Sequence, residues 1–384
     1  MNPTSTTTRH GPRRRLRLSL AVGIGTAAAI GATSTAAAIG ATSTAAAGRD
    51  GHVYAISNDP AGNSLLVFDR AGDGALTAAA PVPTGGTGTG SGIGSQGAVA
   101  VADGGRVVVA VDPGSDEVSL FVIVRGRLVL ADTEPSGGDL PTSVTVHGRD
   151  VYVLNAGVAN NVSGLHIGRA GLEPIVGSTQ ALSEEAAGGA QVAFTPDGRQ
   201  LVVTEKNTNS IDTFRVRDGV AGPAAVFESN GTTPFGFDFG RNGELLVSNA
   251  SGGAPGASSV SSYAIRRDGS LVVLDGPDAT NQTSACWLVA TGRYAYTANT
   301  GSASLSGYSV DRRGALDLLA PDGVSAAAGT TPIDIDASSD GRYVYQLNGG
   351  DDSIGMFAVG RDGELTNLGF VTGLPAAAVG LTAS

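Results

Sequence analysis

One strand–turn–strand pattern recurs seven times along this chain, and no other feature restricts the fold as strongly. Each copy has a turn glycine, an apolar run, a polar or glycine-rich loop, and a second run that ends on an aromatic residue or leucine. The copies begin at Gly51, Gly105, Gly148, Gly198, Gly243, Gly292 and Gly341. Successive turn glycines are therefore 54, 43, 50, 45, 49 and 49 residues apart. A period of roughly 40 to 50 residues is typical of a four-stranded β-propeller blade.

The local chemistry of each copy supports an antiparallel meander. Turns such as Asp340-Gly341 suit hairpins, because glycine accepts a positive φ and aspartate caps its own backbone. Runs such as Val107 to Val111 are apolar throughout, as expected for a strand covered on both faces. The first copy lacks the strand that precedes its turn glycine, and residues 374–381 resemble that missing strand. We predict an all-β, seven-bladed propeller over residues 48–384, closed by a C-terminal strand that completes the first blade.

Residues 1–47 have the pattern of an export signal. A basic start with five arginines leads into an Ala/Gly/Ile-rich stretch without acids, and both Ala36–Ala38 and Ala45–Ala47 offer a cleavage site. The Arg14-Arg15 pair is compatible with twin-arginine export, and an ordinary Sec signal explains it equally well. No later apolar run approaches the ~20 residues that a membrane span needs. We therefore expect a secreted protein.

Charge and cysteine content restrict the kinds of binding partner and the covalent cross-links that the chain can have. Without the signal, 19 basic and 35 acidic residues remain, a net charge of −16. This balance argues against nucleic acid or an anionic membrane as a partner. With Cys286 as the only cysteine, the chain forms no internal disulfide. We expect a monomer without a cofactor. We also expect no His-ligated metal and no histidine general base, because none of the histidines after the signal is placed to reach the channel.

A polar residue ends the second strand of every copy, and these positions are the candidate site. They are Asn58, Asp112, Asn155, Glu205, Asn249, Asn299 and Asn348. In a propeller they form a ring around one mouth of the channel, although asparagine is also favoured where a strand turns into a loop. Glu205 adjoins Lys206, the only lysine, and we take both as candidate catalytic residues. Trp287 is a candidate stacking platform for a sugar or aromatic ligand.

The repeats resemble the lactonase family of seven-bladed propellers, which includes 6-phosphogluconolactonase and carboxymuconate cycloisomerase. The resemblance rests on the Pro-Asp-Gly-Arg turns, the Val-Tyr-x-x-Asn strands and the Asn, Ser and aromatic rhythm of Asn299 to Tyr308. It implies a catalytic histidine in the third blade, an arginine and a glutamate in the fourth, and a later arginine. Glu205 fits the glutamate. Pro141 to Val144, Gly189 to Val192, and Ala298 to Thr300 hold none of the other three.

The basic residues are expected on one face. In a meander, 17 of the 19 that follow the signal fall in or beside the turns opposite the candidate mouth, which leaves only Arg49 and Lys206 elsewhere. The candidate mouth instead carries Asp59, Asp116, Glu117, Asp139, Glu184, Glu185, Asp351 and Asp352. Phosphorylated or polycarboxylate substrates need clustered cations. We therefore predict no turnover of 6-phosphogluconolactone or carboxymuconate.

Together these features favour a secreted, lactonase-like propeller that binds a small neutral or cationic ligand at the channel mouth. Hydrolase or isomerase activity on lactone-like or sugar-like substrates stays open. The alternative is a non-catalytic extracellular scaffold for a protein or a glycan, since fold analogy alone does not decide function. Residues 85–94 are glycine-rich and are taken as a linker, because no lysine or strand-to-helix context supports a phosphate loop.

Overall fold

Strands account for almost all regular structure in residues 51–384, the part of the chain that the computed structural model describes. The remainder is two 3₁₀ turns, η1 (Asp103–Gly105) and η2 (Ser251–Gly253). The expected export signal lies outside these residues. Within them, no helix is long and apolar enough to cross a membrane.

The strands form seven antiparallel sheets. Blade 1 contains β31 (Val379–Ala383), β1 (Gly51–Ile56), β2 (Ser64–Arg70), β3 (Leu76–Ala78) and β4 (Val82–Pro83). Blade 2 contains β5 (Val99–Ala102), β6 (Val107–Asp112), β7 (Glu117–Val124) and β8 (Arg127–Pro135). Blade 3 contains β9 (Pro141–His147), β10 (Asp150–Asn155), β11 (Asn161–Ile167), β12 (Leu172–Pro174) and β13 (Gln180–Ala181).

The other four blades follow the same order. Blade 4 contains β14 (Gly189–Phe194), β15 (Gln200–Glu205), β16 (Ser210–Arg217) and β17 (Val220–Glu228). Blade 5 contains β18 (Pro234–Phe239), β19 (Leu245–Asn249), β20 (Ser259–Ile265) and β21 (Leu271–Ala279). Blade 6 contains β22 (Ala285–Thr291), β23 (Tyr294–Asn299), β24 (Ser304–Val310), β25 (Leu316–Leu318) and β26 (Ala326–Ala327). Blade 7 contains β27 (Pro332–Ala337), β28 (Tyr343–Asn348), β29 (Ser353–Val359) and β30 (Leu365–Thr372).

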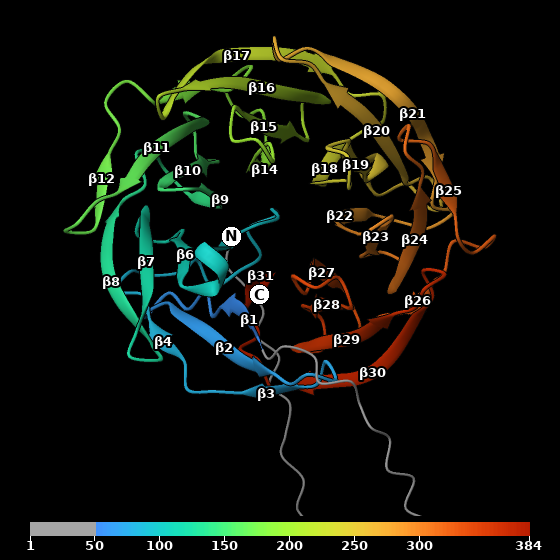
Figure 1. Cartoon of the computed structure of the whole chain (residues 1–384), viewed down its shortest axis with the longest axis horizontal. Helices are drawn as coiled ribbons and strands as arrows, with labels where there is room; N and C mark the ends of the chain where they lie inside the picture. The colour runs from blue at the N-terminus through green and yellow to red at the C-terminus, as the bar shows by residue number, and fades with distance from the viewer. Residues whose placement is uncertain (1–50) are drawn as a thin grey trace, which may run out of the picture. The chain divides into compact units, whose positions relative to one another are not determined.

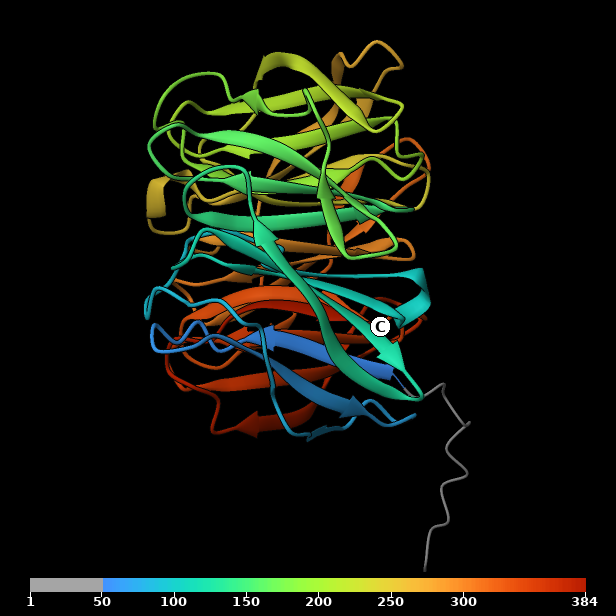
Figure 2. The ribbon, with the colours of Figure 1, turned by 90° about the vertical axis from the view of Figure 1, so that its left-hand side faces the viewer.

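The blades stand around a central channel, which confirms the predicted propeller (Figure 1). The first strand of each blade, here strand A, lies next to the channel, and the last strand, D, lies at the rim. Seen from the side, the strands run between two faces of the ring (Figure 2). The A–B face carries the turns between strands A and B and between C and D. The B–C face carries the B–C loops and the connections from one blade to the next.

A C-terminal strand closes the ring, as predicted. β31 pairs antiparallel with β1 in the register Val53↔Ala383 and Tyr54↔Thr382, so the first blade takes its inner strand from the end of the chain. The strand begins at Val379, later than residue 374 where the sequence comparison put it. Pro375 explains the delay, because its carbonyl closes a turn with the amide of Ala378 before the strand begins.

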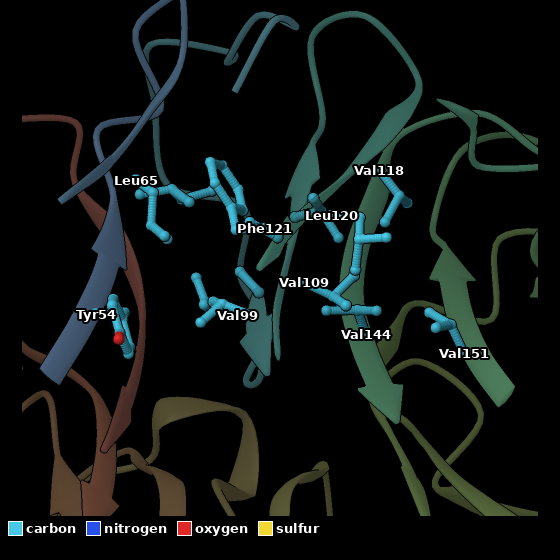
Figure 3. Packing of buried hydrophobic residues seen from close by; sticks show 14 of the residues in the cluster. Tyr54, Leu65, Val99, Val109, Val118, Leu120, Phe121, Val144 and Val151 are labelled. Carbon is cyan, nitrogen blue, oxygen red and sulfur yellow. The ribbon is translucent and has the colours of Figure 1, made fainter. Parts of the chain in front are cut away.

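Apolar contacts between blades explain the uniformly apolar B strands. In the first cluster, Tyr54 and Leu65 of blade 1 lie near Val99 and Phe121 of blade 2 (Figure 3). Val144 of blade 3 continues the same cluster. Each sheet is therefore covered on both faces, and burying a leucine or phenylalanine side chain in this way stabilises the fold by about 1.5–3 kcal/mol.

Leu381 tests the closure directly. It lies in β31, is 3% exposed and packs in the cluster that joins blades 7 and 1. Leu381→Ala should lower the free energy of unfolding by about 2–5 kcal/mol, because a cavity forms where the ring closes. Leu368→Ala, at a 40% exposed position on β30, is the matched control and should cost less than about 1 kcal/mol. Equal losses in urea unfolding would show that β31 is not needed to hold the ring.

Candidate functional site

The glycine-rich connection from blade 1 to blade 2 enters the channel at the B–C face. Gln96 binds the backbone of Leu288 in β22 twice: its side-chain Nε2 donates to the carbonyl at 2.7 Å, and its Oε1 accepts from the amide at 3.0 Å. The Gln96 amide donates to Ala190 of β14 at 3.0 Å, and the Ser95 hydroxyl donates to Thr142 of β9 at 2.7 Å. Residues 94–97, here called the plug, therefore join blades 3, 4 and 6 across the channel. Taking residues 85–94 as a linker missed this role.

Lys206 lies under the plug. Its ammonium donates to the Gly94 carbonyl at 2.5 Å and lies 3.4 Å from the Gly189 carbonyl. It also lies 5.0 Å from the centre of the Phe235 ring, which is a cation–π distance. No carboxylate among residues 51–384 forms an ion pair with it. Burial lowers the pKa of Lys206 from 10.5 to about 8, because no anion offsets the loss of solvent.

Trp287 completes the contact between the plug and the mouth. Its Nε1 donates to the Ser95 carbonyl at 2.9 Å, and its ring centre lies 5.0 Å from that of Phe235. Two consecutive plug carbonyls, of Gly94 and Ser95, thus accept from Lys206 and Trp287. Lys206, Phe235 and Trp287, together with the neighbouring Cys286, are here called the mouth cluster. Burial raises the pKa of the Cys286 thiol to about 11, so the thiol stays protonated at neutral pH.

Glu205 is not part of this cluster. The carboxylate is fully buried and accepts from the Ser183 amide at 2.9 Å, from the Ser183 hydroxyl, and from the Thr208 hydroxyl at 2.6 Å. Consecutive side chains leave a strand on opposite sides, so Glu205 and Lys206 diverge. The structure therefore brings Lys206 and Trp287 together and places Glu205 inside blade 4.

The predicted ring of polar residues lies at the ends of the B strands, inside the blades. The side-chain amides donate to side chains on the neighbouring C strand: Asn155 to Ser163, Asn249 to Ser261, Asn299 to Ser306 and Asn348 to Ser353, at 2.8–3.0 Å. Asp112 accepts from Asn63, Thr84 and Ser119 at 2.5–2.9 Å. All five are at most 1% exposed. The bonds to the serines hold strand B to strand C, and those from Asn63 and Thr84 join Asp112 to blade 1.

Sequence reasoning missed Asp212. It occupies the place on the C strand where blades 2, 3, 5 and 6 have Ser119, Ser163, Ser261 and Ser306, so alignment of the repeats could have found it. Both carboxylate oxygens are buried without a hydrogen-bond donor among the described residues. Burial, and then the neighbouring Glu205, raise the pKa of Asp212 to about 8. Asp212 therefore keeps its proton at neutral pH.

The described residues form no metal site of the usual kind, since no group of three or more His, Cys, Asp or Glu side chains in residues 51–384 could hold an ion. The mouth cluster offers an amine, a thiol, an indole N–H and two aromatic faces. The amine and the indole N–H donate hydrogen bonds to the plug, and the Phe235 and Trp287 rings are each 7% exposed beneath it.

Comparisons with known proteins show the fold and little beyond it. No protein-family model matches the chain, and no curated protein matches it in sequence. Among solved structures, a provisionally assigned 6-phosphogluconolactonase from Bacteroides fragilis is similar with a TM-score of 0.66 at 18% identity, over 87% of this chain and 98% of that one. The periplasmic gluconolactonase PpgL of Pseudomonas aeruginosa is similar with a TM-score of 0.64 at 19% identity, over 87% and 99% of the two chains. The chain thus shares the seven-bladed propeller fold of these lactonase-type proteins.

Asp212 should make the stability of the fold depend on pH. In the folded protein its carboxyl keeps a proton up to about pH 8, whereas the unfolded chain releases that proton near pH 4. The free energy of unfolding should therefore fall as pH rises from about 4 to about 8 and change little above that range. Asp212→Asn should raise it by about 1–3 kcal/mol at pH 8 and by much less at pH 4.

Asp218→Asn, an exposed change in the same blade, serves as the control and should leave the pH profile of the parent protein intact. Urea unfolding at the two pH values provides the comparison. A loss of stability in Asp212→Asn at pH 8 would contradict a protonated Asp212 carboxyl in the folded protein.

Proposed function

We propose that this protein is a secreted propeller that binds a small neutral molecule rich in carbonyl or hydroxyl oxygens, such as a lactone or a sugar, at the mouth cluster. Secretion rests on the sequence of residues 1–47. The lactone or sugar class rests on the chemistry of the mouth and agrees with the fold shared with lactonase-type proteins. Fold similarity alone does not establish a substrate.

One observation carries the proposal. Lys206 and Trp287 donate to the adjacent carbonyls of Gly94 and Ser95, beside the ring of Phe235. A ligand that displaces the plug must satisfy the same two donors, because an unpaired buried donor costs about 1–3 kcal/mol. Neighbouring carbonyl and hydroxyl oxygens on one face of a small ring meet that requirement, and the apolar face of the ring can stack on Phe235 or Trp287.

Charge favours a neutral ligand. A cation beside the Lys206 ammonium would be repelled, since no carboxylate lies next to that group. A polyanion would meet the acidic residues of the surrounding loops, of which Asp59, Asp116 and Glu184 are exposed. Of the two ligand types that the sequence analysis left open, a neutral ligand therefore suits the mouth better than a cationic one.

Catalysis would rest on Lys206 and not on Glu205. With a pKa of about 8, part of the Lys206 amine is unprotonated at neutral pH and can act as a general base toward water attacking a lactone carbonyl. Glu205 is occupied by Ser183 and Thr208 inside blade 4. A non-catalytic scaffold would have the same fold without general-base chemistry at Lys206. Binding and turnover are therefore tested separately.

Trp287 is the only tryptophan of the chain, so its fluorescence reports the mouth directly. Titration with neutral five- and six-membered sugar lactones should give a saturable change. Lys206→Gln should weaken binding at least about tenfold, because a hydrogen bond from a charged donor is lost. Arg217→Gln, a charge change on the opposite face, is the control and should leave the affinity unchanged.

Hydrolysis is followed in the same samples by acid release. Binding with turnover that disappears in Lys206→Gln supports the hydrolase form of the proposal, and binding without turnover supports the scaffold form. Absence of any fluorescence change across the lactones, or a stronger response to 6-phosphogluconolactone than to neutral lactones, would refute a neutral-ligand site at this mouth.

A further inference from the structure

The A–B face, opposite the mouth cluster, has two adjoining cavities around the other end of the channel. One has a volume of about 1310 Å³ and lies between blades 1 and 2, and the other, of about 700 Å³, lies between blades 6 and 7. Both are lined by Asp336, Ser339 and Asp340, so they meet at those residues. The combined groove follows the channel rim over an arc of consecutive blades.

Arginines dominate the charged groups that line this groove. Seven arginines face three aspartates, Asp69, Asp336 and Asp340. The arginines, here called the arginine crescent, come in ring order from blades 5, 6, 7, 1 and 2: Arg241, Arg293, Arg342, Arg361, Arg70, Arg106 and Arg127. None of them forms an ion pair with a carboxylate of residues 51–384. The groove thus has an excess of positive charge although the whole chain is acidic, and Asp340 offsets part of it beside Arg70 and Arg342.

Arg70 is an independent indication that an anion belongs here. The side chain is only 2% exposed and lines the larger cavity. Its Nη2 donates to the Ser384 carbonyl at 3.0 Å, but Nε and Nη1 have no hydrogen-bond partner among the described residues. Leaving donors of a buried guanidinium without a partner is costly, and a bound anion could satisfy those that no described residue reaches. The guanidinium fork matches a planar carboxylate in a bidentate geometry.

The aromatic rings at the crescent are already covered. Arg293 lies over Tyr294 with 5.4 Å to the ring centre, and Arg342 and Arg70 both lie over Tyr343, at 5.2 and 5.9 Å. Nucleic acids gain much of their affinity for single-strand binding proteins by stacking bases on free aromatic faces. No such face is offered at Tyr294 or Tyr343, so the crescent suits charges spaced along a chain better than bases.

We propose that the arginine crescent binds an oligosaccharide of uronic acids, with one carboxylate in the fork of Arg70 and further carboxylates along Arg293 and Arg342. The walls of the larger cavity between these charges are partly apolar, formed by Val67, Val82 and Leu128. Such walls accept the C–H faces of sugar rings. This site is separate from the mouth cluster, lies on the other face, and takes a ligand of opposite character.

Calorimetric titration of the purified protein with a galacturonate hexamer tests the proposal. Binding should be saturable and should weaken strongly between low salt and about 0.3 M salt, because exposed charges are screened. The double variant Arg293→Gln/Arg342→Gln should bind about tenfold more weakly or worse. Arg199→Gln/Arg217→Gln removes the same charge from blade 4, where Arg199 already pairs with Asp197, and should bind within about twofold of the parent protein.

Arg70→Lys keeps the buried charge but removes the fork, so it should also lose affinity, with folding checked by its melting curve. Equal losses in the crescent and control variants would overturn the proposal in favour of a general charge effect. Equal affinity for the galacturonate monomer would reduce the crescent to a single-arginine site and would also overturn it. Tighter binding of a single-stranded DNA dodecamer than of the hexamer would contradict the uronate assignment.

Discussion

Backbone pairing between β1 and β31 is the interaction on which the rest of this structure depends. A propeller blade left open would expose a strand edge on each side of the gap, which invites pairing with other chains. Here the end of the chain supplies the inner strand of the first blade. Two side chains of blade 7 support this strand, because Asp334 accepts from the Leu381 amide and Asp336 from the Ala383 amide, at 2.9 and 2.8 Å.

The closed ring surrounds a channel with two ends. These ends differ chemically, because each blade places different loops on the two faces of the ring. On the B–C face, long connections between blades leave room for a segment as irregular as the plug, and the mouth cluster lies beneath it. On the A–B face, the tight turns between strands bring arginines from successive blades to one rim. One end is therefore suited to a neutral ligand held by Lys206 and Trp287, and the other to an anion.

Most of the fold could be predicted from the sequence, because each blade repeats the same local rules. Turn residues, apolar runs and the unpaired unit near residue 374 led to seven blades and their closure. The side-chain directions of the candidate site were harder to predict. Glu205 and Lys206 are neighbours in sequence, yet one binds Ser183 inside the blade and the other binds the plug carbonyl of Gly94. Alignment of the repeats places Glu205 and Lys206 at the end of a B strand, but it does not show which of the two side chains faces the channel.

The plug could not be predicted, for a physical reason. Residues 85–97 have no hydrophobic periodicity, and many backbone conformations are open to their glycines. Their path is fixed by contacts with distant parts of the chain, above all the paired bonds between Gln96 and Leu288, which lie 192 residues apart. Asp212 was different, since its departure from the serine of blades 2, 3, 5 and 6 is visible once the repeats are aligned.

The mouth depends on a desolvated lysine beneath the plug, and Lys206 is the only lysine of the chain. Its rate of acylation by a small reagent, followed by mass spectrometry of the Lys206 peptide as a function of pH, reports the fraction of neutral amine. We predict a midpoint near pH 8, and Gln96→Ala, which frees the plug from Leu288, should move that midpoint upward. A midpoint near the ordinary lysine value of about 10.4 in the parent protein would contradict a desolvated amine without an ion-pair partner at the mouth.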